Sequence, residues 1–382
     1  MINHVDLKIQ NRVFIAVDDL RVGGVQRLAL DEAYALADQQ RRVTIISLND
    51  QRVGDSILKI DGIERDKLRN LGIDIIYLSG KKYFSKINEI VKVINENEIN
   101  SVVCHSVTAV VMFRLASFIA LRRLTLNLWI HQLITMSAPV QRTKRILYSI
   151  LASRIFFSSH QFKLEWESQM LDKIIRLLLF KSDSKKIVSR LGVYLPRVLN
   201  EGLKIKCSAS NSHLIFASRL SVWKGVNTFL SISKSIADSH SVLMSVNLES
   251  ISKLHQFGEN SQTEHLIDCK PPSFVRNLSK PVHIYPTDYG PNSTNPQAIG
   301  LNVIEFACIG IPSLVSREGL TTYPELYDAG LVLAVDWNNQ MDVKLSLDHL
   351  KSLTQKERLK KAALVRRFCS IEEHVSVLVA FA

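Results

Sequence analysis

The chain has 382 residues, a hydrophobic content of 46% and a formal net charge of +12 at pH 7. That length predicts two domains, and the hydrophobic content excludes a disordered protein. The five cysteines show no CxxC pairing, which predicts reduced thiols rather than a disulfide framework. There is no signal-peptide pattern, and no apolar run reaches the roughly 18 residues that span a bilayer. We therefore expect a cytoplasmic protein.

The positive charge is densest between residues 142 and 190. Basic and apolar side chains alternate in the first part of this stretch: Arg142, Lys144, Arg145 and Arg154 with Ile146, Leu147, Tyr148, Ile150 and Leu151. Two interpretations remain open, a solvated helix face and a basic amphipathic helix on an anionic membrane, at the inner face of the cell membrane. Nucleic acid is disfavoured as a partner, because the aromatic residues are not interleaved as stacking platforms.

In chain order, short apolar runs alternate with longer amphipathic stretches. The runs that predict strands in the first half are 12–17, 43–48, 73–78, 101–104 and 124–130. Between them, stretches such as 26–38 and 85–96 predict helices. Apolar runs of this length are typical of strands buried on both faces, and the alternation is typical of βαβ units.

The pattern weakens between residues 162 and 212 and then resumes. Further strands are predicted at 213–218, 241–246, 265–268, 281–284, 313–316 and 331–335, followed by a helical pattern at 356–368 and an apolar tail at 374–382. We predict an α/β fold of two doubly wound Rossmann-like domains, 1–200 and 201–360, facing a central cleft. We expect 361–382 to pack back on the first domain. Ligands of parallel sheets bind at the carboxyl ends of strands, so the cleft is the predicted site.

Two cations follow the predicted strand 213–218. Arg219 and Lys224 are five residues apart, and Gly225 permits a tight start to the next helix. A planar guanidinium and an ammonium together suit a diphosphate. Two solvent-facing cations would show the same spacing.

A second pattern runs from Gln297 to Pro312. Gly300 begins a predicted helix, whose free N–H groups and dipole favour a phosphate. Glu305 lies about 7 Å further along the helix axis, at roughly 1.5 Å per residue, where its carboxylate suits ribose hydroxyls. Its neighbours are apolar, which indicates a carboxylate with a partner or a task rather than an exposed one. Gly310 ends the helix.

The first half offers weaker signals. Gly23 and Gly24 follow the first strand and allow backbone to approach a ligand, but the GxGxxG spacing of a dehydrogenase is missing. His105 and His131 follow the strands 101–104 and 124–130, so they are expected at the carboxyl edge of the sheet. A structural histidine and a site histidine are both open for each. No cluster has metal-ligand spacing.

In this order, the motifs resemble those of the retaining glycosyltransferases of family 4, which have the GT-B fold. The segment 219–225 matches that family's RLxxxKG motif, and 297–305 matches its Glu-x7-Glu motif with Gln in the first place. The resemblance implies that Arg219 and Lys224 hold the donor diphosphate. It also implies donor contacts for the residues Gly23, Gly24, Gly300, Leu301 and Glu305, the last of them on the ribose.

The resemblance also implies that His131 and Gln297 act at the transferred sugar and that His105 contacts sugar or acceptor. The implied reaction moves a hexose from a nucleotide diphosphate sugar to a polysaccharide or lipid-linked oligosaccharide, as in bacterial surface-glycan (lipopolysaccharide-type) biosynthesis, with neither cofactor nor metal. Gln297 keeps an acceptor and gains two donors but carries no charge. It therefore leaves open a non-catalytic sugar-nucleotide-binding protein, and a sugar-nucleotide epimerase is a further alternative.

Overall fold

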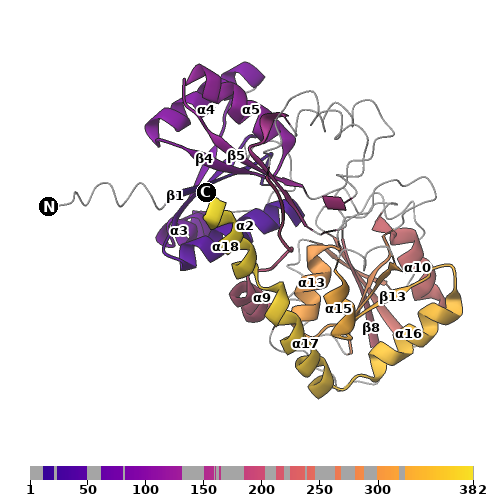
Figure 1. The fold of residues 1–382 in the computed structure, drawn as a ribbon. Coiled ribbons are helices and arrows are strands. Elements are labelled where there is room, and N and C mark those ends of the chain that lie inside the picture. Colours follow the sequence, from indigo (N-terminus) through magenta and orange to yellow (C-terminus); the bar gives the residue numbers. More distant parts are fainter. Residues whose placement is uncertain are drawn as a thin grey trace. The chain divides into compact units, whose positions relative to one another are not determined.

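The structure is a computed structural model, and it describes residues 12–20, 24–49, 62–80, 82–130, 150–158, 160, 163–164, 185–202, 212–218, 224–236, 239–245, 263–267, 280–287, 299–317 and 323–381. The chain divides into two compact units (Figure 1). The first comprises Met1–Leu191 and Ile371–Ala382, and the second comprises Gly192–Ser370. The divisions therefore follow residues 191 and 370, where we had expected them after 200 and 360.

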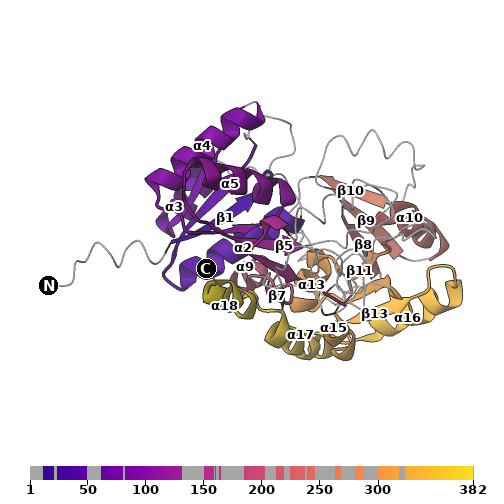
Figure 2. The same cartoon turned by 45° about the horizontal axis from the view of Figure 1, so that its top comes forward.

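The first unit contains a seven-stranded parallel sheet in the order β3-β2-β1-β4-β5-β6-β7. Its strands are β1 (Arg12–Val17), β2 (Arg42–Ser47), β3 (Ile73–Tyr77), β4 (Ser101–Cys104), β5 (Thr125–Ile130), β6 (Arg154–Phe157) and β7 (Lys185–Val188). Among its described residues, the helices are α2 (Gly24–Asp38), α3 (Gly62–Asn70), α4 (Tyr83–Glu96), α5 (Val107–Ile119) and α18 (Ile371–Phe381). Helices α4 and α5 lie side by side (Figure 2).

The second unit contains a six-stranded parallel sheet in the order β10-β9-β8-β11-β12-β13. Its strands are β8 (Ser212–Ala217), β9 (Ser239–Ser245), β10 (Thr263–Ile267), β11 (Val282–Tyr285), β12 (Ser313–Ser316) and β13 (Val332–Val335). The helices in the described part of this unit are α9 (Leu195–Gly202), α10 (Val226–Ser235), α13 (Leu301–Cys308), α15 (Pro324–Asp328), α16 (Gln340–Ser352) and α17 (Gln355–Cys369).

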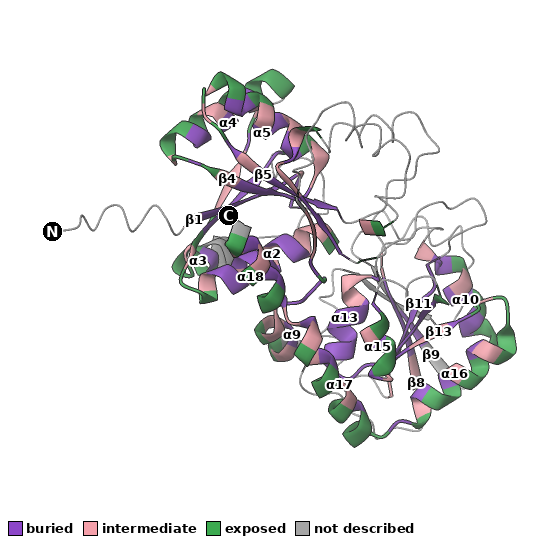
Figure 3. Ribbon diagram, viewed as in Figure 1, coloured by how far each residue is buried: buried purple, intermediate pink, exposed green. Residues whose placement is uncertain are grey.

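Strand order reverses once in each sheet, between β1 and β4 and between β8 and β11. These are the switch points at which open α/β sheets bind ligands, beyond the carboxyl ends of the strands. The α/β class with two doubly wound parallel sheets is thereby confirmed. The helix faces toward the sheets are buried and the outer faces are exposed (Figure 3), which is why strands read as continuous apolar runs and helices as amphipathic ones.

The prediction of a helix face at Arg154 is wrong. Arg154 opens β6, and its Nη1 donates to Asn127 Oδ1 at 3.4 Å. The three residues that follow it, 155–157, are completely buried, and this apolar run pairs with β5 and β7 in the sheet. The residues 142–149 of the basic stretch lie outside the described part of the chain.

The two C-terminal helices belong to different units. Helix α17 packs against α13 and α15 in the second unit, whereas α18 packs against α2 in the first. A capping box of Thr354 and Glu357 begins α17. Arg358, 2% exposed, donates to the carbonyls of Leu353, Pro281 and Leu350 and so ties α17 to the start of β11. None of the helices in the described residues combines the length and apolar character needed to cross a bilayer.

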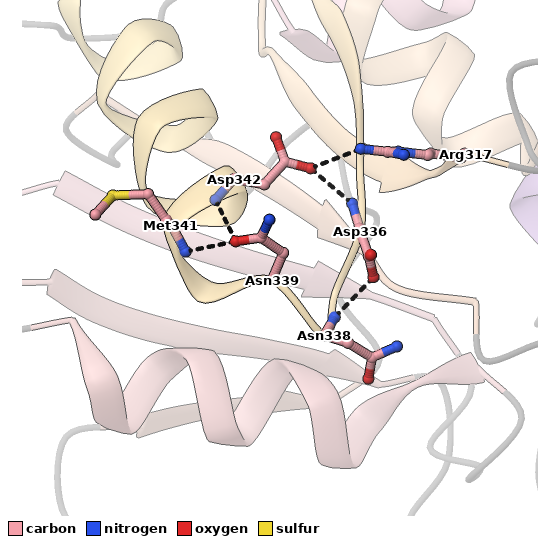
Figure 4. Close-up of polar contacts among 6 residues, drawn as sticks. All are labelled: Arg317, Asp336, Asn338, Asn339, Met341 and Asp342. Carbon is pink, nitrogen blue, oxygen red and sulfur yellow. Dashed lines mark hydrogen bonds and ion pairs between the residues drawn. The ribbon is translucent and has the colours of Figure 1, made fainter.

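The connection from β13 to α16 is held by side-chain caps (Figure 4). Asn339 Oδ1 accepts from the backbone N–H groups of Met341 and Asp342, both at 3.1 Å. Asp342 accepts from the N–H of Asp336 at 2.9 Å and pairs with Arg317, which follows β12. The pair is partly exposed and contributes little energy, but the caps fix the carboxyl ends of β12 and β13.

Candidate functional site

Helix α13 begins at the switch point of the second sheet. Gly300 is its N-cap residue, with φ −66° and ψ 144°, and Leu301 is its first helical residue. The side-chain amide of Asn302 donates to the carbonyl of Ala217 at the end of β8. This bond holds the first turn of α13, with its free N–H groups and partial positive charge, at the carboxyl edge of the sheet.

Lys224 and Tyr285 meet at the same edge. Lys224 Nζ donates to Tyr285 Oη at 3.1 Å and lies 5.5 Å from the centre of the ring. Burial raises the pKa of the Tyr285 phenol, so the hydroxyl stays protonated. A Cβ atom added to Gly300 would lie 2.7 Å from Tyr285 Oη. The ammonium, the phenol and the start of α13 therefore form one contiguous polar group.

Gly225 has a structural reason to follow Lys224. It is the N-cap residue of α10 with φ +77°, a left-handed conformation that favours glycine. An added Cβ atom would overlap the carbonyl oxygen of Pro286, directly after β11. A side chain at 225 would force apart the start of α10 and the end of β11, and with them Lys224 and Tyr285.

Glu305 is buried, at 3% exposure, and its carboxylate is paired. Arg197 Nη2 donates to Glu305 Oε1 at 2.8 Å, with side-chain exposures of 14% and 4%. Arg197 comes from α9, which packs against α13 within the second unit. The sequence indicated that Glu305 needs a partner but did not identify it. The only signal was an arginine in the short amphipathic run 195–202, where the overall pattern is weak.

A buried histidine supports the first turn of α13. His283 Nδ1 lies 3.1 Å from Ser313 Oγ, and its Nε2 lies 3.4 Å from the Asn302 amide nitrogen. Burial lowers the His283 pKa to about 3, so the ring is neutral at physiological pH. Because the amide donates to Nε2, the ring hydrogen is assigned to Nδ1, which donates to Ser313. Sequence reasoning missed this support.

In the first unit, His105 belongs to a buried cluster. Its Nε2 lies 2.8 Å from Glu32 Oε2, and Glu32 Oε1 lies 2.7 Å from His374 Nε2. His374 Nδ1 in turn lies 2.6 Å from Ser189 Oγ. All four residues are at most 4% exposed. The cluster joins α2, the end of β4, the end of β7 and α18.

The charge of Glu32 is stabilised within this cluster. Burial acts to raise the pKa of Glu32, but the charge and hydrogen bond of His105, with those of His374, outweigh it and lower the pKa to about 2. The order Ser189, His374, Glu32 is that of a nucleophilic triad, but Ser189 is only 4% exposed. We assign the cluster a structural task, which is to fasten α18 to α2.

The predicted site residues fall into two groups within the described chain. The second unit brings Lys224, Gly300 and Leu301 together, with Glu305 further along the same helix. Gly24, at the start of α2, and His105 belong to the first unit. The predicted residues Gly23, His131, Arg219 and Gln297 lie outside the described residues. In the part of the chain that is described, no group of three or more His, Cys, Asp or Glu side chains could hold a metal.

No protein-family model matches the chain, and no curated protein matches it. Solved structures do match. Anabaena Alr3699/HepE, in complex with UDP-glucose, is 15% identical with a TM-score of 0.69 over 97% of this chain and 100% of that chain. Sucrose-phosphate synthase from Thermosynechococcus elongatus is 12% identical, with a TM-score of 0.68 over 97% and 98%. A glycosyltransferase from Rickettsia africae is 15% identical, with a TM-score of 0.68 over 97% of both chains. The chain has the GT-B fold.

Proposed function

We propose that this chain is a retaining glycosyltransferase that moves a hexose from a nucleotide diphosphate sugar to a polysaccharide or lipid-linked oligosaccharide. One observation carries the proposal. Lys224, Tyr285 and the start of α13 converge at the switch point between β8 and β11, with the buried carboxylate of Glu305 on the same helix.

The spacing along α13 suits the two ends of a nucleotide diphosphate. A phosphate at the helix start would meet free N–H groups, the positive end of the dipole and the Lys224 ammonium. Glu305 lies about 7 Å further along the axis, at roughly 1.5 Å per residue, a height that suits the ribose hydroxyls. Arg219, outside the described residues, is the proposed second cation on the diphosphate.

The structural neighbours support a nucleotide sugar as donor. HepE was solved with UDP-glucose, with UDP and glucose, and with UDP. An α-glucosyltransferase, 11% identical with a TM-score of 0.61, was solved with UDP-glucose and DNA. UDP sugars are therefore the first donors to test on this chain.

The proposed chemical step needs no nucleophile from the protein. An acceptor hydroxyl attacks the anomeric carbon on the face from which the diphosphate departs, the bond from that carbon to the phosphate oxygen breaks, and the departing diphosphate takes the hydroxyl proton. Fixed positive charge at Lys224 and the α13 terminus would stabilise the leaving diphosphate. Gln297 and His131 are the proposed contacts to the charge that develops on the sugar, without a metal or cofactor. We place the acceptor at the inner face of the cell membrane.

The test is donor binding followed by donor consumption. Calorimetry with UDP and UDP-glucose, then with other nucleotide sugars, should detect binding in the native protein and in Lys234→Ala, and none in Lys224→Ala. Lys234 is the matched control because it lies exposed at the end of α10, away from Tyr285. Unchanged binding in Lys224→Ala would refute the donor site.

Turnover then separates the three functions. Release of UDP that rises with added glycan acceptor supports the transferase. Gln297 favours a second candidate, a non-catalytic sugar-nucleotide-binding protein, which would bind a donor without consuming it. Conversion of the donor into another nucleotide sugar without acceptor would instead identify an epimerase.

A further inference from the structure

We propose that Arg197 is a positioning residue for ribose recognition, because it orients the Glu305 carboxylate toward the hydroxyls of the donor. The proposal rests on the proposed function. It adds a residue from α9 to a ribose contact that the sequence motifs assign to Glu305 of α13. The observation is the buried ion pair, in which Arg197 Nη2 lies 2.8 Å from Glu305 Oε1.

The pair fixes a torsion that the helix leaves open. The terminal torsion of a glutamate is broad and roughly two-fold, so backbone and packing alone do not set the plane of the carboxylate. A hydrogen bond from a planar guanidinium sets that plane. A carboxylate has about four acceptor positions, so the bond from Arg197 is compatible with further bonds from ribose hydroxyls.

Burial strengthens the hydrogen bond that sets this orientation of the Glu305 carboxylate. The two side chains are 14% and 4% exposed, and the neighbouring α13 residues 303, 304, 306 and 307 are fully buried. Little water competes for the carboxylate in such surroundings, so a charge-assisted bond is stronger than at the surface.

A second arginine contacts α13 and serves as the control. Arg366 of α17 donates through Nε to the carbonyl of Cys308, at 2.7 Å, and so caps the opposite end of the helix. The Arg366 bond goes to backbone, whereas the Arg197 bond goes to the Glu305 side chain. Both support α13, but only Arg197 sets the direction of the carboxylate.

The experiment compares two probes, UDP and 2′,3′-dideoxy-UDP, by calorimetry on the full chain. Native protein should bind UDP roughly 10- to 100-fold more tightly, as expected for hydroxyls bonded to a charged group. In Arg197→Met the ratio should fall to about one, since the carboxylate is misdirected, while dideoxy-UDP binding changes little. Arg366→Gln should lower the melting temperature but keep the native ratio.

Arg197→Lys keeps the charge but loses the planar fork, so it should fold and show an intermediate ratio, at least about threefold below native. A native ratio in both Arg197 variants, or in Arg197→Lys alone if Arg197→Met does not fold, would overturn the proposal. Equal native affinity for the two probes would also overturn it, because Glu305 would not contact the hydroxyls. Native protein that binds neither UDP nor any other nucleoside diphosphate would instead refute the proposed function.

Discussion

Glu32 in the first unit and Glu305 in the second are both buried carboxylates, 0% and 3% exposed. Glu32 bonds to two histidines, His105 and His374, whereas Glu305 bonds to Arg197. The first unit therefore shares its buried carboxylate between two imidazole rings, while the second unit buries an ion pair with one arginine, which stays charged.

The two carboxylates also join different parts of the chain. The Glu32 cluster connects α2 to α18, elements from opposite ends of the sequence within the first unit. The Glu305 pair lies on α13, whose N-cap residue Gly300 lies close to Tyr285, the residue that Lys224 contacts. We infer that Glu32 serves the assembly of its unit and Glu305 serves a ligand, and the predictions below test that contrast.

The largest effect is expected for Glu305→Gln. The change leaves the Arg197 charge buried without its counter-ion, which typically costs about 3–5 kcal/mol in the free energy of unfolding, and UDP binding should be lost. Glu32→Gln should cost only about 1–3 kcal/mol, because the Gln side chain keeps an acceptor and gains donors for its two histidine partners, and UDP binding should persist. Urea unfolding and calorimetry measure the two quantities. Equal UDP binding in both variants would contradict the assigned contrast.

Acid should weaken the second unit before the first. His283 has its pKa lowered from 6.5 to about 3 by burial, so its contribution is complete above pH 6.5 and declines as the pH falls toward 3. Glu32 has its pKa lowered from 4.5 to about 2, because its histidine partners outweigh burial, so its contribution begins to decline only below pH 4.5. Between pH 6.5 and pH 4.5 the free energy of unfolding of the second unit should therefore fall by about 3 kcal/mol, whereas that of the first unit should change little.

Hydrogen exchange resolves the two units, with amides of α13 reporting the second and amides of α18 the first. His283→Gln should remove the loss of protection in α13 between pH 6.5 and 4.5, and Glu32→Gln should remove the loss in α18 below pH 4.5. Protection that falls in both helices at the same pH would show that the two clusters do not act separately.

Two glycines at helix starts offer a smaller test. An added Cβ atom at Gly300 would crowd Tyr285 Oη and Asn302 Oδ1, whereas one at Gly24 would meet nothing within 4 Å. Gly300→Ala should therefore displace the start of α13, lower stability by about 2 kcal/mol and weaken UDP binding about tenfold or more. Gly24→Ala should leave the melting temperature unchanged. A Gly300→Ala variant that is as stable as the native protein and binds UDP as tightly would show that Tyr285 and Asn302 do not hold the first turn of α13 in place.

The strands were predictable because the pattern that marks them lies within a few consecutive residues. A parallel strand buried on both faces is a short apolar run, and the run 313–316 coincides with β12. The start of α13 and the burial of its carboxylate were also predictable, since Gly300 begins the helix and Glu305 lies among apolar neighbours in the sequence. Arg154 was mispredicted because a basic residue that opens a buried strand resembles one on a helix face.

The partners of the buried groups were not predictable. Arg197 lies 108 residues from Glu305 along the chain, and His374 lies 342 residues from Glu32. A single sequence indicates that a carboxylate among apolar residues needs a partner, but the identity of that partner depends on how α9 packs on α13 and how α18 packs on α2. Tyr285 was missed for the same reason, because its sequence position is that of an ordinary strand residue.

The smallest predicted effect compares a hydroxyl in each unit. Tyr285→Phe keeps the ring beside Lys224 but loses the bond to its ammonium, while Ser189→Ala loses the bond to His374. Each should cost about 1 kcal/mol of stability, the usual net value of one hydrogen bond. Only Tyr285→Phe should weaken UDP binding, about fivefold, because Lys224 is then less well held at the start of α13. Calorimetry measures this difference in affinity for UDP. An equal loss of affinity in Ser189→Ala would show that the Glu32 cluster contributes to ligand binding. The two buried carboxylates would then not differ in the way that we infer.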